Sequence, residues 1–362
     1  MPLTDIKVFD STMRDGEQQP MLSFRDDEKI ALCYQLEKLG IYEIDLMPSI
    51  DEHERILIRL LNNTRLRERL GAATMVHRKY VDQAVAVNAK AAYVFVHVSD
   101  PLMQARGKTR EQNTVDIIDC IGYARQQGLI VDFCGGDGTR ADTGYLTELL
   151  TEIGPLIRHY QPCDTSGLMT PEKSVKHVKM LTDILGEKIV VHYHNDNGQA
   201  AQSVIAALHA GAIGFDGTFL GIGERAGNVA TEEVLYKLRD TEGIEIEGID
   251  YQQIEPTVEM VRRMCRGVEP PSTNLERRYP NVSGIHAKAL LGKRDAFDFE
   301  YTPDAVETML FFGKHSGRSN YMLLFDGQKT EEECAGIRDE VKRLSREQLK
   351  DFTATEIREM FG

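Results

Sequence analysis

Short β-rich runs alternate with amphipathic helical stretches along the first two thirds of the chain, and this alternation restricts the fold more than any other feature. Eight such runs are visible, centred near Ile6, Ile44, Ala72, Tyr93, Ile130, Tyr160, Ile189 and Phe215. Successive runs lie about 30 residues apart, the length of one strand with its returning helix. Strict alternation predicts parallel strands, because a parallel pair needs a long crossover connection.

Eight strand–helix units have the content of a closed (β/α)8 barrel, which takes roughly 250 residues. A doubly wound open sheet is the alternative, but no G-x-G-x-x-G fingerprint follows the first run. The helical stretches fit the same organisation: residues 26–40 place apolar side chains at helical spacing and end at Gly40. We therefore predict an α/β fold, a (β/α)8 TIM barrel.

The alternation stops near Tyr251. Residues 268–284, VEPPSTNLERRYPNVSG, are proline-rich and loop-like, and the chain from Lys329 onward is a polar helical run with repeated charge pairs. This change predicts two parts: a catalytic barrel over residues 1–255, then a linker and a smaller, mainly helical C-terminal subdomain over residues 256–362.

Composition excludes several classes of function. The chain has 43 Lys+Arg against 57 Asp+Glu, a net charge of −14, and no basic run that could follow a phosphate backbone. No apolar run approaches the roughly 20 residues of a membrane span, and charges at residues 5 and 7 argue against a signal peptide. Six cysteines without C-x-x-C spacing are typical of free thiols in a reducing cytosol. We expect a cytoplasmic protein that binds neither nucleic acid nor membrane.

A metal site is the main chemical signal in the sequence. His192 and His194 lie two residues apart at the end of the seventh run, so both imidazoles can face the barrel mouth, where barrel enzymes place their active sites. Asp15 follows the first run, which neighbours the eighth once the barrel closes. One carboxylate and two imidazoles with open positions suit a catalytic divalent cation. The alternative is a pair of ordinary polar residues.

Two neighbouring segments add to this signal. Arg14, beside Asp15, suits the polarisation of a carbonyl oxygen or the binding of a carboxylate; a structural salt bridge is the alternative. The glycine-rich segment GTFLGIGERAGN follows the eighth run, and either Asn228 or Glu224 could turn inward from it. Such a segment can also be a plain turn.

Five motifs occur in a fixed order: DSTMRDGEQQP, HYHNDNGQA, GTFLGIGERAGN, SGIHAKAL and FGKHSGR. Together they resemble the acyl-CoA Claisen-condensing synthases, which include 2-isopropylmalate, homocitrate and citramalate synthases. The resemblance covers roughly residues 4 to 320. It implies that acetyl-CoA condenses with a 2-oxoacid, after which water hydrolyses the thioester.

The resemblance also implies roles for individual residues. A divalent cation (Mg²⁺, Mn²⁺ or Zn²⁺) would sit on Asp15, His192 and His194, with Asn228 as a ligand or close neighbour. Arg14 would stabilise the developing oxyanion.

Other residues would serve the substrates. Asp45 falls where the family usually has glutamate, and Thr165 would help hold the 2-oxoacid carboxylate. His286 would take part in proton transfer, by analogy in the partner subunit's site, which implies a homodimer. Because the net charge repels anionic substrates, local cations would bind them: Arg14, Arg140, Lys314 and Arg318.

The chain departs from the family pattern in two places. Gly136 stands where the family commonly has a glutamate, so proton transfer would fall on Asp137 or on His286 and its neighbours, or activity would be altered. Only Tyr301 is available as the aromatic hydroxyl that normally follows the histidine, and it could instead be a packed core residue.

Two alternatives to a synthase remain. A lyase on the same barrel would cleave a C–C bond, although related lyases carry a cysteine in the glycine-rich loop and lack the added subdomain. A non-catalytic homologue is the second alternative, suggested by Gly136.

Overall fold

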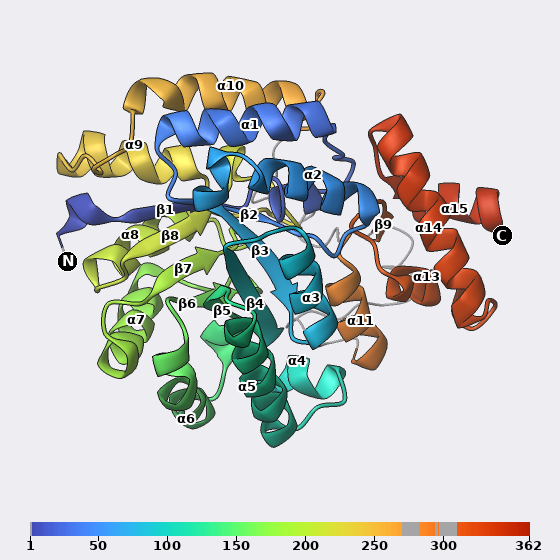
Figure 1. Ribbon diagram of the computed structural model, residues 1–362, viewed down its shortest axis with the longest axis horizontal. Helices are drawn as coiled ribbons and strands as arrows, with labels where there is room; N and C mark the ends of the chain where they lie inside the picture. Colours follow the sequence, from blue (N-terminus) through green and yellow to red (C-terminus); the bar gives the residue numbers. More distant parts are fainter. Residues whose placement is uncertain (1, 270–281, 294–295, 297–309) are drawn as a thin grey trace.

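A closed barrel of parallel strands forms the body of the protein (Figure 1). The computed structural model describes residues 2–269, 282–293, 296 and 310–362. Strand neighbours follow chain order, and β1 pairs with β8 to close the barrel. The strands are β1 (Lys7–Asp10), β2 (Glu43–Leu46), β3 (Leu70–Met75), β4 (Ala91–His97), β5 (Ile130–Gly136), β6 (Tyr160–Asp164), β7 (Val190–Tyr193) and β8 (Gly214–Gly217). The predicted TIM barrel is confirmed, with each of the eight predicted runs at a strand.

Helices surround the strands as an outer ring (Figure 1). They are α1 (Asp26–Leu39), α2 (Glu52–Asn62), α3 (Arg78–Ala86), α4 (Asp100–Ala105), α5 (Arg110–Gln126), α6 (Thr143–Ile153), α7 (Pro171–Leu185), α8 (Ala200–His209), α9 (Thr231–Glu242) and α10 (Ile254–Met264). Local sequence sets their ends. Helix α1 stops at Gly40, whose φ of 99° is left-handed, and Thr109 begins α5 by accepting a hydrogen bond from the Gln112 N–H.

Helix α10 packs with the barrel. Its buried side chains Val258, Val261 and Met264 belong to the same apolar core as the barrel helices. The helix begins at the predicted domain boundary, residue 255, and yet contributes to the apolar core that it shares with the barrel helices. We therefore propose that the boundary lies after α10.

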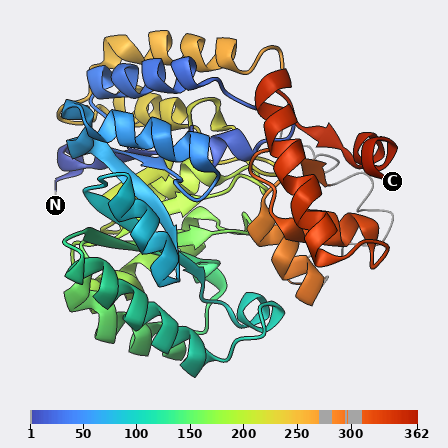
Figure 2. The ribbon, with the colours of Figure 1, turned by 45° about the vertical axis from the view of Figure 1, so that its right-hand side comes forward.

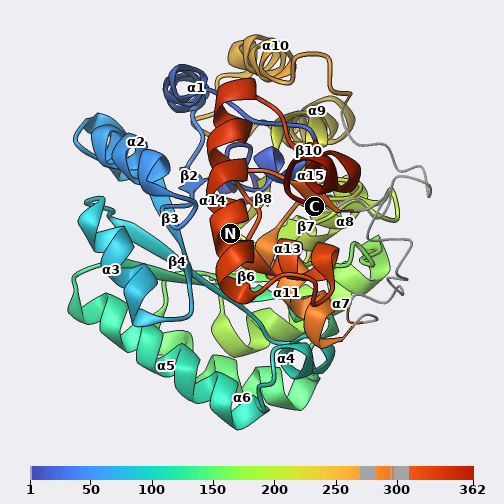
Figure 3. The ribbon, with the colours of Figure 1, turned by 90° about the vertical axis from the view of Figure 1, so that its right-hand side faces the viewer.

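The C-terminal subdomain has a second apolar core, formed by residues such as Phe312, Tyr321, Leu324 and Val341. Its elements are α11 (Gly284–Gly292), β9 (Phe311–Phe312), α13 (Arg318–Phe325), α14 (Glu331–Gln348), β10 (Phe352–Thr353) and α15 (Ala354–Phe361), with β9 and β10 paired antiparallel. The mainly helical subdomain is thus as predicted. It covers one end of the barrel (Figure 3), and the N-terminus lies at the other (Figure 2).

A fully buried group of charged side chains joins the subdomain to the barrel. We call it the interface ion cluster: Glu17, Lys29, Glu54, Lys314 and His315. The Lys29 ammonium lies 2.7 Å from Glu17 and 2.8 Å from Glu54. From the subdomain, Lys314 and His315 also contact the Glu17 carboxylate. Burial alone would raise the pKa of Glu17, but the two lysines hold it well below its usual range.

The cluster corrects one expectation from the sequence. Lys314 is not available to a substrate, because its side chain is fully buried against Glu17 and the Phe24 carbonyl. Arg318 is half exposed and pairs with Glu331 at 2.8 Å.

Among the described residues, no helix is long and apolar enough to cross a membrane.

Candidate metal centre and active site

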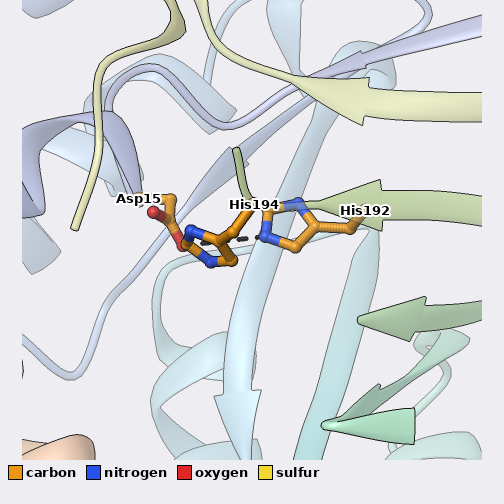
Figure 4. A group of neighbouring side chains, drawn as sticks. All are labelled: Asp15, His192 and His194. Carbon is orange, nitrogen blue, oxygen red and sulfur yellow. Dashed lines mark ion pairs between the residues drawn. The ribbon is translucent and has the colours of Figure 1, made fainter. Parts of the chain in front are cut away.

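Asp15, His192 and His194 meet at the barrel mouth (Figure 4). His192 is on β7, His194 follows it, and Asp15 lies in the turn after β1. One ligand atom of each residue lies within 4.8 Å of the others, and all three side chains are buried. The Asp15 carboxylate is 3.7 Å from His192 Nε2 and 3.9 Å from His194 Nε2. The two Nε2 atoms therefore converge on one carboxylate oxygen.

The opposite ring nitrogen of each histidine is held by the protein. His192 Nδ1 is 3.0 Å from the Asp216 carboxylate, and His194 Nδ1 is 3.1 Å from the Gly227 carbonyl. An acceptor at Nδ1 fixes the proton there and leaves Nε2 as a lone-pair donor, the arrangement in which histidine binds metals. Burial keeps the pKa of His194 well below its usual value, which favours the neutral, ligating form.

Asn228 completes the group from the loop after β8. Its Nδ2 donates to the Asp15 carboxylate at 2.8 Å and to the Ile222 carbonyl at 3.1 Å. Its Oδ1 is buried and has no hydrogen-bond partner. Gly223 allows this approach, since a Cβ there would lie 2.2 Å from Asn228 Nδ2, and its φ of 150° also suits glycine.

Arg14 stands among three carboxylates. Its Nε donates to Asp45 at 2.6 Å and its Nη1 to Asp15 at 2.8 Å, while Nη2 is 4.0 Å from Asp216. Burial would raise the pKa of Asp15, but Arg14 and the two histidines lower it well below its ordinary value. Burial raises the pKa of Asp45 to about 7 against the opposing effect of Arg14, and Asp45 Oδ1 has no partner. One guanidinium therefore faces more buried acidic groups than it can neutralise.

These residues fit a divalent cation. The donor set is one carboxylate and two imidazoles whose Nε2 atoms converge, with the unpartnered Asn228 Oδ1 held beside them. The surplus of carboxylates calls for positive charge, since uncompensated buried charge is costly.

The structure brings together three residues that the sequence assigned to catalysis or substrate binding: Asp137, Arg140 and Thr165. Their contacts within the described residues are mainly with one another. The Asp137 carboxylate accepts hydrogen bonds from Ser99 and from Arg140 Nε at 2.9 Å, and its N–H donates to Thr165 Oγ1 at 2.8 Å. Asp137 is fully buried, and burial raises its pKa. Arg140 also donates to the Ala296 carbonyl at 2.9 Å. In the described residues this group ties β5, β6 and the subdomain together.

His286 enters the mouth from α11 of the same chain. Its Nδ1 lies 2.5 Å from the carboxylate of Glu224, a residue of the glycine-rich loop. The other oxygen of Glu224 accepts the N–H groups of Val282 and Ser283, at 3.2 and 2.8 Å, where α11 begins. Both Glu224 and Asn228 thus turn inward, and His286 lies at the mouth of its own chain. Tyr301 lies outside the described residues.

His97 is a mouth residue that sequence reasoning missed. It ends β4, and its imidazole stacks on that of His286 with ring centroids 6.3 Å apart and planes 22° from parallel. Gly136 lies opposite it in the β4–β5 pair, and a Cβ at Gly136 would come within 2.8 Å of His97 Cδ2. The only signal in the sequence was residue spacing: Tyr93, Phe95 and His97 are two residues apart, so their side chains lie on the same face of the strand.

Known proteins resemble this chain over most of its length. A putative (R)-citramalate synthase from Methanothermobacter thermautotrophicus is 33% identical over 86% of this chain and 64% of its own, so this chain spans about two thirds of that relative. A probable 2-isopropylmalate synthase from Ignicoccus hospitalis is 32% identical over 94% of this chain and 88% of its own. Homocitrate synthase 1 from Nostoc sp. PCC 7120 is 30% identical over 98% of this chain and 96% of its own.

A solved structure shows the same fold. The HMG-CoA lyase of Bacillus subtilis superposes with a TM-score of 0.65 at 19% identity, over 75% of this chain and 97% of its own. The family model described as HMGL-like matches residues 5–261, which span the barrel and most of α10. By this match and by its relatives, the chain belongs to the HMGL-like family.

Proposed function

We propose that this protein is an acyl-CoA:2-oxoacid C-acyltransferase. It condenses acetyl-CoA with a 2-oxoacid in a Claisen-type reaction that depends on a divalent cation, and it releases CoA and a 2-hydroxy-2-substituted di- or tricarboxylic acid. The observation that carries the proposal is the group of Asp15, His192 and His194 beside Arg14, with more buried carboxylates than cations. Relatives named as synthases of this type extend over both parts of the chain.

Each residue contributes a specific interaction. Asp15, His192 and His194 would hold the cation, with Asn228 beside them, and the bound cation would supply Lewis-acid polarisation and a template for the acceptor. Arg14 is fixed by Asp15 and Asp45, so its charge is already in place for an oxygen that becomes negative. His286, which contacts Glu224 at the same mouth, would take part in proton transfer.

A lyase is the second reading and is not favoured. Solved lyases share the barrel at 19–21% identity, which speaks for the fold only. The glycine-rich loop, GIGERAGN, contains no cysteine, and the relatives that match the subdomain as well are named synthases. The prediction of a homodimer stays with the proposal and is checked by sedimentation.

A thiol-release assay tests the proposal. The purified chain is given acetyl-CoA, Mg²⁺, Mn²⁺ or Zn²⁺, and one acceptor at a time: pyruvate, 2-oxoisovalerate, 2-oxoglutarate, oxaloacetate or a phosphorus-bearing 2-oxoacid. We expect one acceptor to give CoA release that EDTA abolishes and added metal restores. Metal binding without CoA release from any acceptor would point to a non-catalytic homologue, and cleavage of a 3-hydroxyacyl-CoA would point to a lyase.

A further inference from the structure

His97 lies where a reacting group could meet it. His97 is the last residue of β4, on the same strand face as Phe95. Its imidazole stacks on that of His286, which the subdomain contributes to the mouth. About 6% of His97 is exposed, so it is screened from bulk water without being sealed. Strand ends at this face of a barrel are where catalytic side chains are found.

The ring nitrogens of His97 distinguish it from the other histidines of the mouth. His192, His194 and His286 each have Nδ1 against a fixed acceptor, respectively Asp216, the Gly227 carbonyl and Glu224. In the described parts of the chain, neither ring nitrogen of His97 has a hydrogen-bond partner, and no carboxylate contacts it. One nitrogen of a neutral imidazole is always a proton acceptor, so His97 has a lone pair that no protein group uses.

The surroundings keep this imidazole neutral. Burial holds the pKa of His97 well below its usual value, and the cations of Arg106 and Arg140 act in the same direction. A base must be unprotonated before it can act, and these surroundings meet that requirement at neutral pH.

The opposite strand leaves space for the ring. Gly136 is the register partner of His97, and a Cβ at Gly136 would approach His97 Cδ2 to 2.8 Å. No real Cβ contact is that short, so a side chain at residue 136 would displace the imidazole. Histidine on β4 and glycine on β5 therefore form a matched pair.

We infer that His97 is a further catalytic residue of the proposed condensation, the base that removes a proton from the methyl group of the thioester. This inference rests on the proposed function. One C–H bond breaks and its proton moves to His97, while the C–H electron pair becomes the new C–C bond to the ketone carbon. The ketone π pair moves to its oxygen, which takes a proton, for which His286 is the neighbouring donor. Water then cleaves the C–S bond: its oxygen joins the acyl carbon to give a carboxylate, one of its protons goes to the CoA thiol, and the other is released and can return to His286.

Two variants test this assignment. His97→Gln keeps similar volume and polarity without a basic nitrogen, and His177→Gln is the matched control. His177 is a largely buried histidine on the outer helix α7, with Nε2 unpartnered and no contact to the mouth. We expect kcat of His97→Gln to fall about 100-fold or more, the usual contribution of a general base. Metal affinity and acceptor KM should stay within threefold, and His177→Gln should match the wild type.

A second readout follows the proton itself. Exchange of the acetyl-CoA methyl protons with solvent deuterium, recorded by NMR with the metal-loaded protein, should be lost in His97→Gln and kept in His177→Gln. In His97→Ala, added imidazole should restore part of kcat, because it can enter the space that the side chain vacated.

The outcomes separate the two proposals. If the wild type condenses an acceptor and His97→Gln keeps its kcat within threefold, the assignment is overturned and the proposed function stands. A loss of kcat matched by an equal loss of metal affinity would also overturn it, because His97 would then be structural. If the wild type condenses no acceptor, both proposals fall.

Discussion

Two buried groups of charged side chains, the interface ion cluster and the barrel mouth, solve the problem of burial in opposite ways. In the cluster, Glu17 and Glu54 face Lys29 and Lys314, so charges balance and each ammonium contacts a carboxylate. At the mouth, Arg14 is the only arginine or lysine of the described residues that contacts Asp15, Asp45 or Asp216. The mouth also holds buried oxygens without partners, on Asp45 and Asn228.

The difference shows how to tell structure from function among buried charges. A buried charge is tolerated when it is paired and hydrogen-bonded, and the cluster meets this condition with protein groups alone. At the mouth the described protein cations do not balance the buried carboxylates, and under the proposed function a bound divalent cation would do so. Charge that the protein leaves uncompensated at the C-terminal face of a barrel is therefore the mark of a binding site.

The largest expected effect comes from a substitution in the candidate metal centre at the barrel mouth. His192→Ala removes one ligand, and loss of the cation's contribution, several kcal/mol, should lower kcat about 1,000-fold. Isothermal titration with Mn²⁺ should show the loss of binding. Without metal, the unfolding midpoint in urea should not fall; if it does fall, the histidine is structural and the contrast between the two groups fails.

The next largest effect comes from a substitution in the interface ion cluster. Lys314→Met leaves the Glu17 carboxylate short of one buried partner, which should lower the free energy of unfolding by about 3–5 kcal/mol. Arg318→Met, in the same sequence motif, removes a half-exposed pair with Glu331 and should cost less than about 1 kcal/mol. Urea unfolding measures both. Equal costs for the two variants would contradict the assigned role of Lys314.

A smaller effect concerns the orientation of a ligand. Asp216→Asn keeps the shape of the group that holds His192 Nδ1 but removes its charge, and such changes typically cost 10–100-fold in metal affinity. Competition with a chromophoric chelator measures the affinity. An unchanged affinity would mean that the Asp216 carboxylate does not serve the metal centre.

A further effect, spread over several pH units, is a pH dependence beside the cluster. Asp351 is fully buried near Glu17 and Lys314, and burial raises its pKa to about 8. The folded state therefore holds a proton that the unfolded state releases above its ordinary pKa near 4. The free energy of unfolding should fall as pH rises from about 5 to about 8, by at most about 1.4 kcal/mol per pH unit.

Asp351→Asn isolates this contribution, because the amide oxygen can still accept the Met21 N–H without titrating. Urea unfolding at pH 5.5, 6.5, 7.5 and 8.5 should give a flatter profile for the variant than for the wild type. Parallel profiles would show that Asp351 does not carry the titration.

The sequence predicted the repeating and local features well. A period of about 30 residues sets the number of strands, and strand parity places His192 and His194 on one face. Asp15 could be added because closing a barrel makes its first and last strands neighbours. The structure brings these three residues together, and these inferences need only topology.

Long-range pairings were beyond sequence reasoning. Lys314 was assigned to anionic substrates, but its partner Glu17 lies almost a whole chain length away, and nothing local in either motif indicates the contact. In the sequence alone, His97 is a polar residue at the end of an apolar run. Only the register between β4 and β5 reveals that Gly136 makes room for it.

The glycine-rich loop has contacts on two sides. Asn228 donates to Asp15 in the metal group, and Glu224, four residues earlier, holds both His286 and the start of α11. Under the proposed function, one short segment therefore takes part in two equilibria, cation binding and the docking of the subdomain. By thermodynamic linkage any coupling between them is reciprocal: if the docked subdomain tightens the cation, the cation favours docking by the same factor.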